Sequence, residues 1–310
     1  MVRGTRRHNM TRDNWIFLGV GASFLLFVAG IVSIFLWRIK RRGGRAPVDF
    51  KLLRGPGETL RRRIAKFDED ALARIGGAAL VPTLAIMPVL WLTVKLRPQT
   101  WTGLWVGLGI AAVVFVGALI MAGRWALRDL KRYRDDHLGY LGEREVAEHL
   151  VPLLVGGYRV FHDVPAKGVK TDFNLDHVAV GPNGVALIET KTLRKGRALP
   201  GRKDHVVIYD GNKLIWPWGS ENRYGLDQAV NEADWLEKFI HQRTGIQTCV
   251  KPILALPGWW VDPQGKGIVA VISSKNVASE VEGFGPRVLS GEQIELIARQ
   301  LDVICRDVVD

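Results

Sequence analysis

The chain has 310 residues and a formal net charge of +12 at pH 7, which leaves room for about two domains. Residues 1–138 carry 23 Lys and Arg against 9 Asp and Glu, whereas residues 139–310 carry 20 against 22. The excess of positive charge therefore lies in the hydrophobic N-terminal half. It does not indicate a nucleic-acid-binding surface on the C-terminal half. Cys249 and Cys305 form no CxxC motif and no Cys/His cluster, which argues against a structural zinc site.

Three apolar segments of the N-terminal half are long enough to cross a bilayer as helices. Residues 15–37 and 100–122 contain no charged side chain, and residues 76–96 are interrupted by Pro82 and Pro88. About 20 apolar residues span the hydrocarbon core as a helix. Because so few residues separate the last two segments, we expect them to form a hairpin of antiparallel helices.

The distribution of Lys and Arg predicts how these spans are oriented. Residues 38–75 and 123–138 are rich in basic side chains, whereas the loop of the hairpin carries only Lys95 and Arg97. We therefore expect a multi-pass protein of a bacterial inner membrane, with its C-terminal domain in the cytoplasm and its N-terminus outside. The arginines that precede the first span count against an outside N-terminus, and this conflict stays open.

The segment between the first two spans has two parts. Residues 43–57 are rich in Gly and Pro and are typical of a linker. Leu60, Ile64, Phe67 and Leu72 then recur at helical spacing among basic residues, which predicts an amphipathic helix on the inner membrane surface. The alternative is a soluble helix that packs on the C-terminal domain.

From residue 139 onward, helical and strand patterns alternate. The expected elements, in chain order, are helix 140–154, strand 158–164, hairpin 176–191, hairpin 205–216, helix 224–242, strand 251–256, strand 268–273 and helix 290–306. Ser290 and Gln293 stand in capping-box positions at the start of the last helix. This order implies a mixed α/β sheet with helices packed on it. The expected division of the chain is 1–37, 38–75, 76–122, 123–138 and 139–310.

Two carboxylates and an ammonium group come together in the first hairpin. Asp176 opens one apolar strand, and Glu189-Thr190-Lys191 closes the next one after a Gly-Pro-Asn-Gly turn. Strand side chains alternate between faces, so Glu189 and Lys191 point the same way. Carboxylate oxygens can hold Mg²⁺. A neighbouring lysine can orient or deprotonate the attacking water, or stabilise the charge on a phosphate.

Other residues near this hairpin have competing interpretations. Asp172 competes with Asp176, because residues i and i+4 of a strand share a face. Glu143 lies on the apolar stripe of the first helix, where a carboxylate is costly unless it is paired or binds a cation; a solvated helix start is the alternative. His177 is interpreted as a structural hydrogen-bonding residue rather than a ligand. Without a metal, the acids and Lys191 would form a buried ion pair, which stabilises a fold poorly.

A basic loop and an aromatic pair follow. The loop from Arg194 to Lys203 contains no acid, and it could contact phosphates or simply be solvated. Trp259 and Trp260 could stack on bases, although insertion into the core or the membrane interface is the favoured interpretation.

This set of residues resembles the nuclease-related domain (NERD), which is placed in the PD-(D/E)xK nuclease superfamily. The matching residues are Gly142-Glu143, Asp176-His177, Gly184, Glu189-x-Lys191 and Gln228-Ala229, and the resemblance covers about residues 138–256. It implies a restriction-endonuclease-like fold. It also implies that Asp176 and Glu189 bind a metal, that Glu143 contacts the metal directly or through water, that Lys191 is catalytic and that Gln228 contacts substrate or Lys191. Thr190 departs from the apolar residue common at its position.

We therefore expect a membrane-anchored endo- or exonuclease that uses Mg²⁺ or Mn²⁺ to hydrolyse nucleic acid, with DNA favoured over RNA. The alternative is a non-catalytic, membrane-tethered scaffold that binds nucleic acid or protein with the same fold. The slightly acidic C-terminal half supports this alternative, because nucleic-acid binders are usually basic. A transporter is disfavoured, since ion pathways usually need a charged residue inside the spans.

Overall fold

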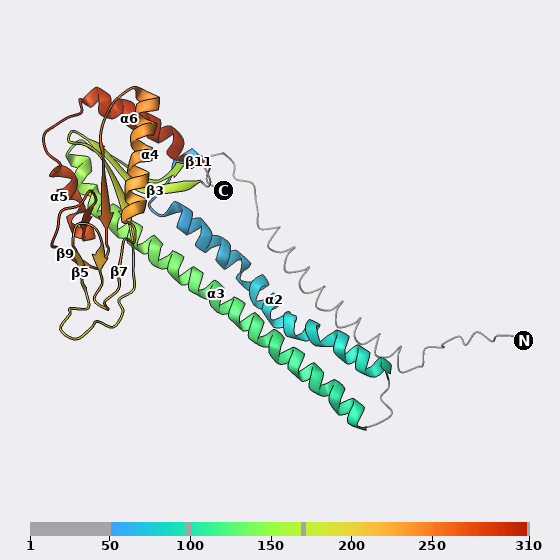
Figure 1. The fold of residues 1–310 in the computed structure, drawn as a ribbon. Helices are drawn as coiled ribbons and strands as arrows, with labels where there is room; N and C mark the ends of the chain where they lie inside the picture. The colour runs from blue at the N-terminus through green and yellow to red at the C-terminus, as the bar shows by residue number, and fades with distance from the viewer. Residues whose placement is uncertain (1–50, 97–100, 169–171, 309–310) are drawn as a thin grey trace, which may run out of the picture. The chain divides into compact units, whose positions relative to one another are not determined.

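The structure is a computed structural model that describes residues 51–96, 101–168 and 172–308 (Figure 1). The first expected span, residues 15–37, and the segment around it lie outside the described residues. Apart from Val308, all described residues belong to one compact unit, Lys51–Asp307.

Two long helices, α2 (Glu58–Leu96) and α3 (Trp101–Val155), lie side by side (Figure 1). Both contain a stretch that is long and apolar enough to cross a membrane, as judged by length and composition alone. In these stretches only 6% and 11% of the residues are buried, unlike the core helix of a soluble protein. The described residues thus contain two candidate spans, where the whole sequence leads us to expect about three.

Helix α3 is longer than the sequence suggests. Residues 123–138, expected as a basic linker, are helical and join the apolar stretch to the expected helix 140–154 without a break. The reason is local: residues 124–138 contain neither Gly nor Pro and are rich in helix formers such as Leu, Arg and Lys.

The expected amphipathic segment forms the first turns of α2 and packs against α3. The ring of Phe67 lies 4.7 Å from that of Tyr133, and Arg74 forms a salt bridge of 2.8 Å with Asp129. These contacts join the segment to the part of α3 that was expected as a basic linker, whereas the alternative placed it on the C-terminal domain. Its position on the membrane surface stays a prediction. Before α2, the expected linker contains a short strand, β1 (Lys51–Leu53), which pairs with β11 (Arg306–Val308).

A mixed five-stranded sheet forms the centre of the C-terminal region, in the order β10-β8-β4-β3-β2. Its strands are β2 (Arg159–Ala166), β3 (Phe173–Gly181), β4 (Gly184–Thr190), β8 (Val250–Ala255) and β10 (Ala270–Ile272). The hairpin expected from the Gly-Pro-Asn-Gly turn is confirmed, since β3 and β4 are antiparallel and Gly181 pairs with Gly184. β4, β8 and β10 run parallel. The expected mixed α/β architecture is therefore present.

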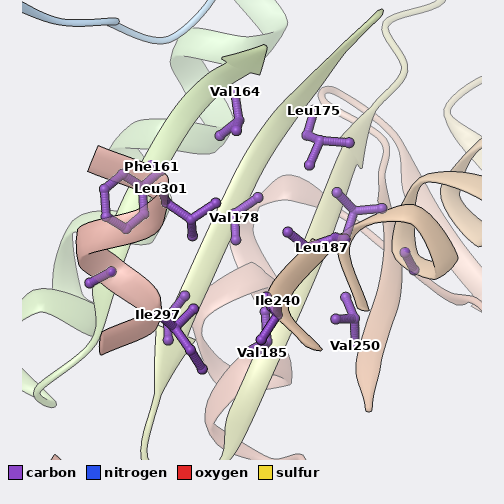
Figure 2. Close-up of a cluster of buried hydrophobic side chains, with 14 of the residues drawn as sticks. Phe161, Val164, Leu175, Val178, Val185, Leu187, Ile240, Val250, Ile297 and Leu301 are labelled. Atoms are coloured by element: carbon purple, nitrogen blue, oxygen red, sulfur yellow. The ribbon is translucent and has the colours of Figure 1, made fainter. Parts of the chain in front are cut away.

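Helices cover both faces of this sheet. On one face, α4 (Leu226–Thr244) and α6 (Gly291–Cys305) bury a core of aliphatic side chains, several of which Figure 2 shows between the helices and the strands. On the other face, the end of α3 and α5 (Val277–Glu282) pack through Val146, Leu150 and Val281. Burying each such side chain contributes about 1.5–3 kcal/mol. Ser290 and Gln293 form the expected capping box at the start of α6.

A second mixed sheet has the strand order β7-β6-β5-β9. Its strands are β5 (Val206–Tyr209), β6 (Leu214–Ile215), β7 (Glu221–Asn222) and β9 (Trp260–Pro263). The second hairpin was expected from the sequence, whereas β9 was not, because Trp260–Pro263 is short and lacks an apolar alternation. A short turn of 3₁₀ helix, η1 (Ser274–Asn276), precedes α5. This sheet and the first one share a core rich in tryptophan.

Candidate active site

The end of β4 carries the two residues of the Glu-x-Lys motif. Glu189 is buried, with 1% of its surface exposed, and the Nζ of Lys191 donates a hydrogen bond of 2.5 Å to its Oε1. The Lys191 side chain is 19% exposed. Its backbone nitrogen donates to the carbonyl of Ala255 at the end of β8. The motif therefore stands where two parallel strands end, with the lysine between the buried acid and solvent.

Asp176 on β3 is tied directly to this strand end. Its Oδ2 accepts a hydrogen bond of 2.8 Å from the backbone nitrogen of Thr190. The last paired residues of the hairpin on this side are His177 and Ile188, so Asp176 comes next to the Glu-x-Lys motif across the hairpin. Asp172, the competing candidate, precedes β3 and is exposed.

Glu143 reaches the site from α3. It is buried, with 8% of its surface exposed. A side chain in place of Gly142 would collide with the side chain of Thr192, just beyond Lys191. The glycine thus allows α3 to approach the end of β4 closely enough to place Glu143 there, which gives a physical reason for the Gly-Glu pair.

Helix α4 contributes Gln228 and a further acid, Glu232. The Nε2 of Gln228 donates to the Oε1 of Glu232 at 2.8 Å, and Glu232 is 4% exposed. Sequence reasoning missed Glu232. A signal for it existed, since it lies four residues after Gln228 and on the buried stripe of α4 that includes Ala233 and Leu236.

The start of α4 lies against Lys191. Gly225 has φ = 82°, and a Cβ atom on it would come within 2.9 Å of the Cγ of Lys191. Both the left-handed backbone and the close approach require glycine at this position. The ring of Tyr224 lies 5.7 Å from the Nζ of Lys191, so the ammonium group also meets an aromatic face.

The acids are crowded in a site of low polarity. Burial raises the pKa of Glu143 to about 9, of Glu189 to about 8 and of Glu232 to about 7. Neighbouring acids add to the shifts of Glu143 and Glu189, whereas the hydrogen bond with Glu189 lowers the pKa of Glu232. Burial followed by the charge of Glu189 raises the pKa of Asp176 well above its ordinary value. Burial opposes the charged form of Lys191, but Glu189 and Asp176 outweigh it and raise its pKa. The positive charge of Lys191 therefore does not balance the four carboxyl groups of Glu143, Asp176, Glu189 and Glu232.

Residues 138–257 match the nuclease-related domain (NERD) family. This part of the chain is a nuclease-related domain. No curated protein and no solved structure matches the chain. The NERD domain runs from the last part of α3 to just beyond β8, and it includes all of the acids described above together with Lys191 and Gln228. The resemblance carried by these residues is thus confirmed.

Nuclease-related domains typically use divalent metals, and the acids of this NERD domain fit such an ion in part. Among the described residues, no three His, Cys, Asp or Glu side chains lie close enough to form a ready metal site. The Oε2 atoms of Glu189 and Glu232, however, are buried and accept no hydrogen bond from an N–H group within the described part of the chain. The two carboxyl groups lie within hydrogen-bond reach of each other, so they either share a proton or bind a cation, and carboxylate oxygens are ligands that Mg²⁺ and Mn²⁺ prefer.

His177 has a separate environment. Its Nδ1 lies 2.8 Å from the Nδ1 of His162, its partner residue across β2 and β3. Burial lowers the pKa of His162 to about 4 and that of His177 well below its ordinary value. Both rings are therefore neutral at pH 7, and the Nδ1–H of one ring donates a hydrogen bond to the Nδ1 of the other. This contact is a structural hydrogen bond of the kind expected for His177, whereas its Nε2 is buried and meets no hydrogen-bond partner among the described residues.

The tryptophan pair divides between core and surface. Trp259 is 2% exposed and packs with Trp216 and Trp218, as expected for a core wedge, whereas Trp260 is 67% exposed. The basic loop is irregular, and Arg194 contacts Asp135 and the carbonyl of Arg134 on α3.

Proposed function

We propose that this protein is a membrane-anchored, metal-dependent nuclease that hydrolyses phosphodiester bonds, with DNA favoured over RNA. The single observation that carries the proposal is the meeting of Asp176, Glu189 and Lys191 at the ends of two adjacent strands within a NERD domain. The mixed sheet with helices on both faces supports a restriction-endonuclease-like fold.

Asp176 and Glu189 would hold the metal, with Glu143 in support. When bound, Mg²⁺ or Mn²⁺ supplies Lewis-acid chemistry, in that it polarises the phosphodiester and lowers the pKa of a coordinated water. The raised pKa values of the acids and the closeness of the buried carboxyl groups of Glu189 and Glu232 support a cation at this position. Lys191 and a metal would compete for Glu189, because the Nζ of Lys191 already bonds to its Oε1.

The environment of Lys191 favours an electrostatic role. Its pKa is raised by the nearby carboxylates, so the side chain keeps its proton at neutral pH. A protonated lysine that is partly exposed can stabilise the negative charge that builds up on the phosphate, and it can orient the attacking water. Gln228 lies on the neighbouring helix and holds Glu232 in place through its amide.

Membrane anchoring is part of the proposal. The apolar stretches of α2 and α3 leave most of their side chains exposed, as lipid-facing helices do. The excess of Lys and Arg on the side of the NERD domain supports a cytoplasmic location for that domain. The bilayer would then be a partner of the hairpin, and nucleic acid a partner of the NERD domain.

The test uses the full chain, purified in detergent micelles. It is incubated with labelled single- and double-stranded DNA and RNA in Mg²⁺, Mn²⁺ or EDTA. We expect metal-dependent cleavage that Glu189→Ala or Lys191→Ala reduces by at least about a hundredfold, the scale of losing one electrostatic contact to the transition state. Lys238→Ala, which removes an exposed lysine of α4, should keep full activity.

Two outcomes would overturn the proposal. One is full activity of both site variants; the other is the absence of cleavage by a folded wild-type chain with every substrate and metal. If that inactive chain still bound nucleic acid, the non-catalytic scaffold would become the better description of the protein.

A further inference from the structure

Trp260 stands exposed at the start of β9, in the sheet that packs beside the site. Trp260 is 67% exposed, and its backbone nitrogen donates a hydrogen bond of 2.9 Å to the carbonyl of His205. Trp260 also pairs with Val206 in the parallel register of β9 and β5. The backbone that presents the indole is thus held on a strand and does not belong to a loose loop.

The neighbouring residue anchors this strand to the core. The ring of Trp259 lies 5.1 Å from that of Trp216, and its Nε1 donates to the carbonyl of Leu193 at 3.2 Å. Because adjacent side chains of an extended backbone point to opposite sides, burying Trp259 leaves Trp260 facing solvent. Trp259 therefore packs in the core beside Trp216, and packing gives no reason for a large ring at position 260.

Two hollows flank Trp260, and both are lined by cationic side chains. One is lined by Lys195 and Lys275, and the other by Arg202 and Lys203; Trp260 and His205 border both. Their acidic lining residues are Glu145 and Asp262. Glu145 accepts a hydrogen bond of 2.7 Å from Ser274. Together the two hollows are lined by four lysine and arginine side chains and two carboxylates. This excess of positive charge suits phosphate groups.

These hollows are connected by the chain to the candidate active site. Lys191 and Ala255 are hydrogen-bonded at the ends of β4 and β8. Lys195 follows Lys191 by four residues, and Trp260 follows Ala255 by five. The bond between Trp259 and Leu193 ties the two continuing segments together, and the Nζ of Lys195 lies 5.8 Å from the ring of Trp259. A ligand bound beside Trp260 would thus lie next to the two segments of chain that continue from the ends of β4 and β8.

We propose that Trp260 and the two hollows beside it form a binding site for single-stranded nucleic acid. An unpaired base stacks on the exposed indole, and the phosphates on either side meet Lys195, Lys275, Arg202 and Lys203. Single strands are favoured over duplexes, because base pairing and stacking in a duplex hide the faces that an aromatic ring needs. The inference rests on the proposed nuclease function only in taking the bound strand to be the substrate.

The test measures binding without cleavage. The full chain in detergent micelles is titrated into a labelled oligothymidylate or a labelled duplex of equal length, in EDTA, and anisotropy is recorded. Removing one stacking platform weakens single-strand binding by about 5- to 160-fold, so we expect that loss for Trp260→Ala. Trp260→Phe, which keeps an aromatic face, should retain most of the affinity, and duplex binding should change less than single-strand binding.

A charge series tests the hollows separately. Lys195→Glu and Lys203→Glu should weaken binding of the oligothymidylate and reduce its dependence on salt. Lys238→Glu, on the exposed surface of α4 and outside both hollows, is the control with the same charge change and should bind like the wild type.

Specific results would overturn the inference. Wild-type affinity of Trp260→Ala for the oligothymidylate would do so, as would equal losses for single strand and duplex. Because binding is measured without metal, this outcome is independent of catalysis. A wild-type chain that cleaves in Mg²⁺ while Trp260→Ala binds normally would leave the nuclease proposal standing and remove only this site.

Discussion

At the scale of single residues, the protonation of the acids is the property that links structure to chemistry. Burial raises the pKa of Glu143 to about 9 and that of Glu189 to about 8, so protons compete with a metal for these two acids near neutral pH. Burial also raises the pKa of Glu232, to about 7. A metal bound to the carboxylate form must displace these protons, so metal binding and proton release are coupled.

We therefore predict that Mg²⁺ or Mn²⁺ binding releases protons at pH 7 and that affinity rises as the pH is raised from about 6 to about 9. The sign follows from the shifts, because raised pKa values favour the protonated, metal-free form at low pH. Calorimetric titration in buffers of different ionisation enthalpy measures the released protons directly.

The matched variants for this prediction lie on α4. Glu232→Gln removes a neighbouring charge that raises the pKa of Glu189, so the rise in affinity should shift to lower pH. Asp234→Asn, at an exposed position of the same helix, should leave the profile unchanged. A metal affinity that does not depend on pH would contradict the prediction.

At the scale of elements, the segment before α2 is joined to the NERD domain by a buried polar cluster. Asp163 on β2 accepts hydrogen bonds from the Nε of Arg54 at 2.9 Å and from the backbone nitrogen of Thr59 at 2.8 Å. Asn174 donates to the other oxygen of Asp163 at 3.0 Å. Asp163 has φ = 48°, an unfavourable backbone conformation for a residue other than glycine. These contacts make residues 54–59 part of the domain's structure.

We predict that Asp163→Ala destabilises the full chain by about 3–5 kcal/mol, because it breaks a buried ion pair with Arg54 and removes the acceptor of the Thr59 backbone nitrogen. The side chains of Arg54 and Asp163 are only 10% and 5% exposed. Chemical denaturation followed by tryptophan fluorescence measures the change.

Asp302→Ala is the control for this prediction, since it breaks the exposed salt bridge between Asp302 and Arg306. Exposed pairs contribute about 0–1 kcal/mol, so this variant should be close to wild type. If the two variants lost the same small amount of stability, the cluster around Asp163 would be no more than a surface contact.

At the scale of the whole molecule, the chain's own cysteines test the proposed orientation. Cys249 is exposed, whereas Cys305 is buried and its burial raises the pKa of the thiol to about 12. Low exposure and a low thiolate fraction both slow the reaction of Cys305 with maleimides.

We predict that a membrane-impermeant maleimide labels the protein only after the inner membrane of spheroplasts is permeabilised. Cys249 should carry the label, and Cys249→Ser should abolish most of it. Full labelling of intact spheroplasts would place the NERD domain outside the cell and overturn the proposed orientation.

Local patterns in the sequence determined a large part of this protein. Two long apolar helices, the β3–β4 hairpin, the capping box of α6 and the meeting of Asp176 with Glu189-x-Lys191 follow from apolar runs, turn residues and strand alternation. Each of these features depends on residues close together in the chain or joined by one turn. Periodicity and turn chemistry report such short-range relations directly.

Only the tertiary structure decided the features that join distant residues. Glu232 enters the site because α4 packs across the end of β4, and Arg54 meets Asp163 across 109 positions. Trp259 and Trp260 are neighbours of the same type, yet one is buried and the other exposed, because pairing of β9 with β5 sets which side faces the core. Such contacts depend on how separate elements pack, which no local pattern encodes.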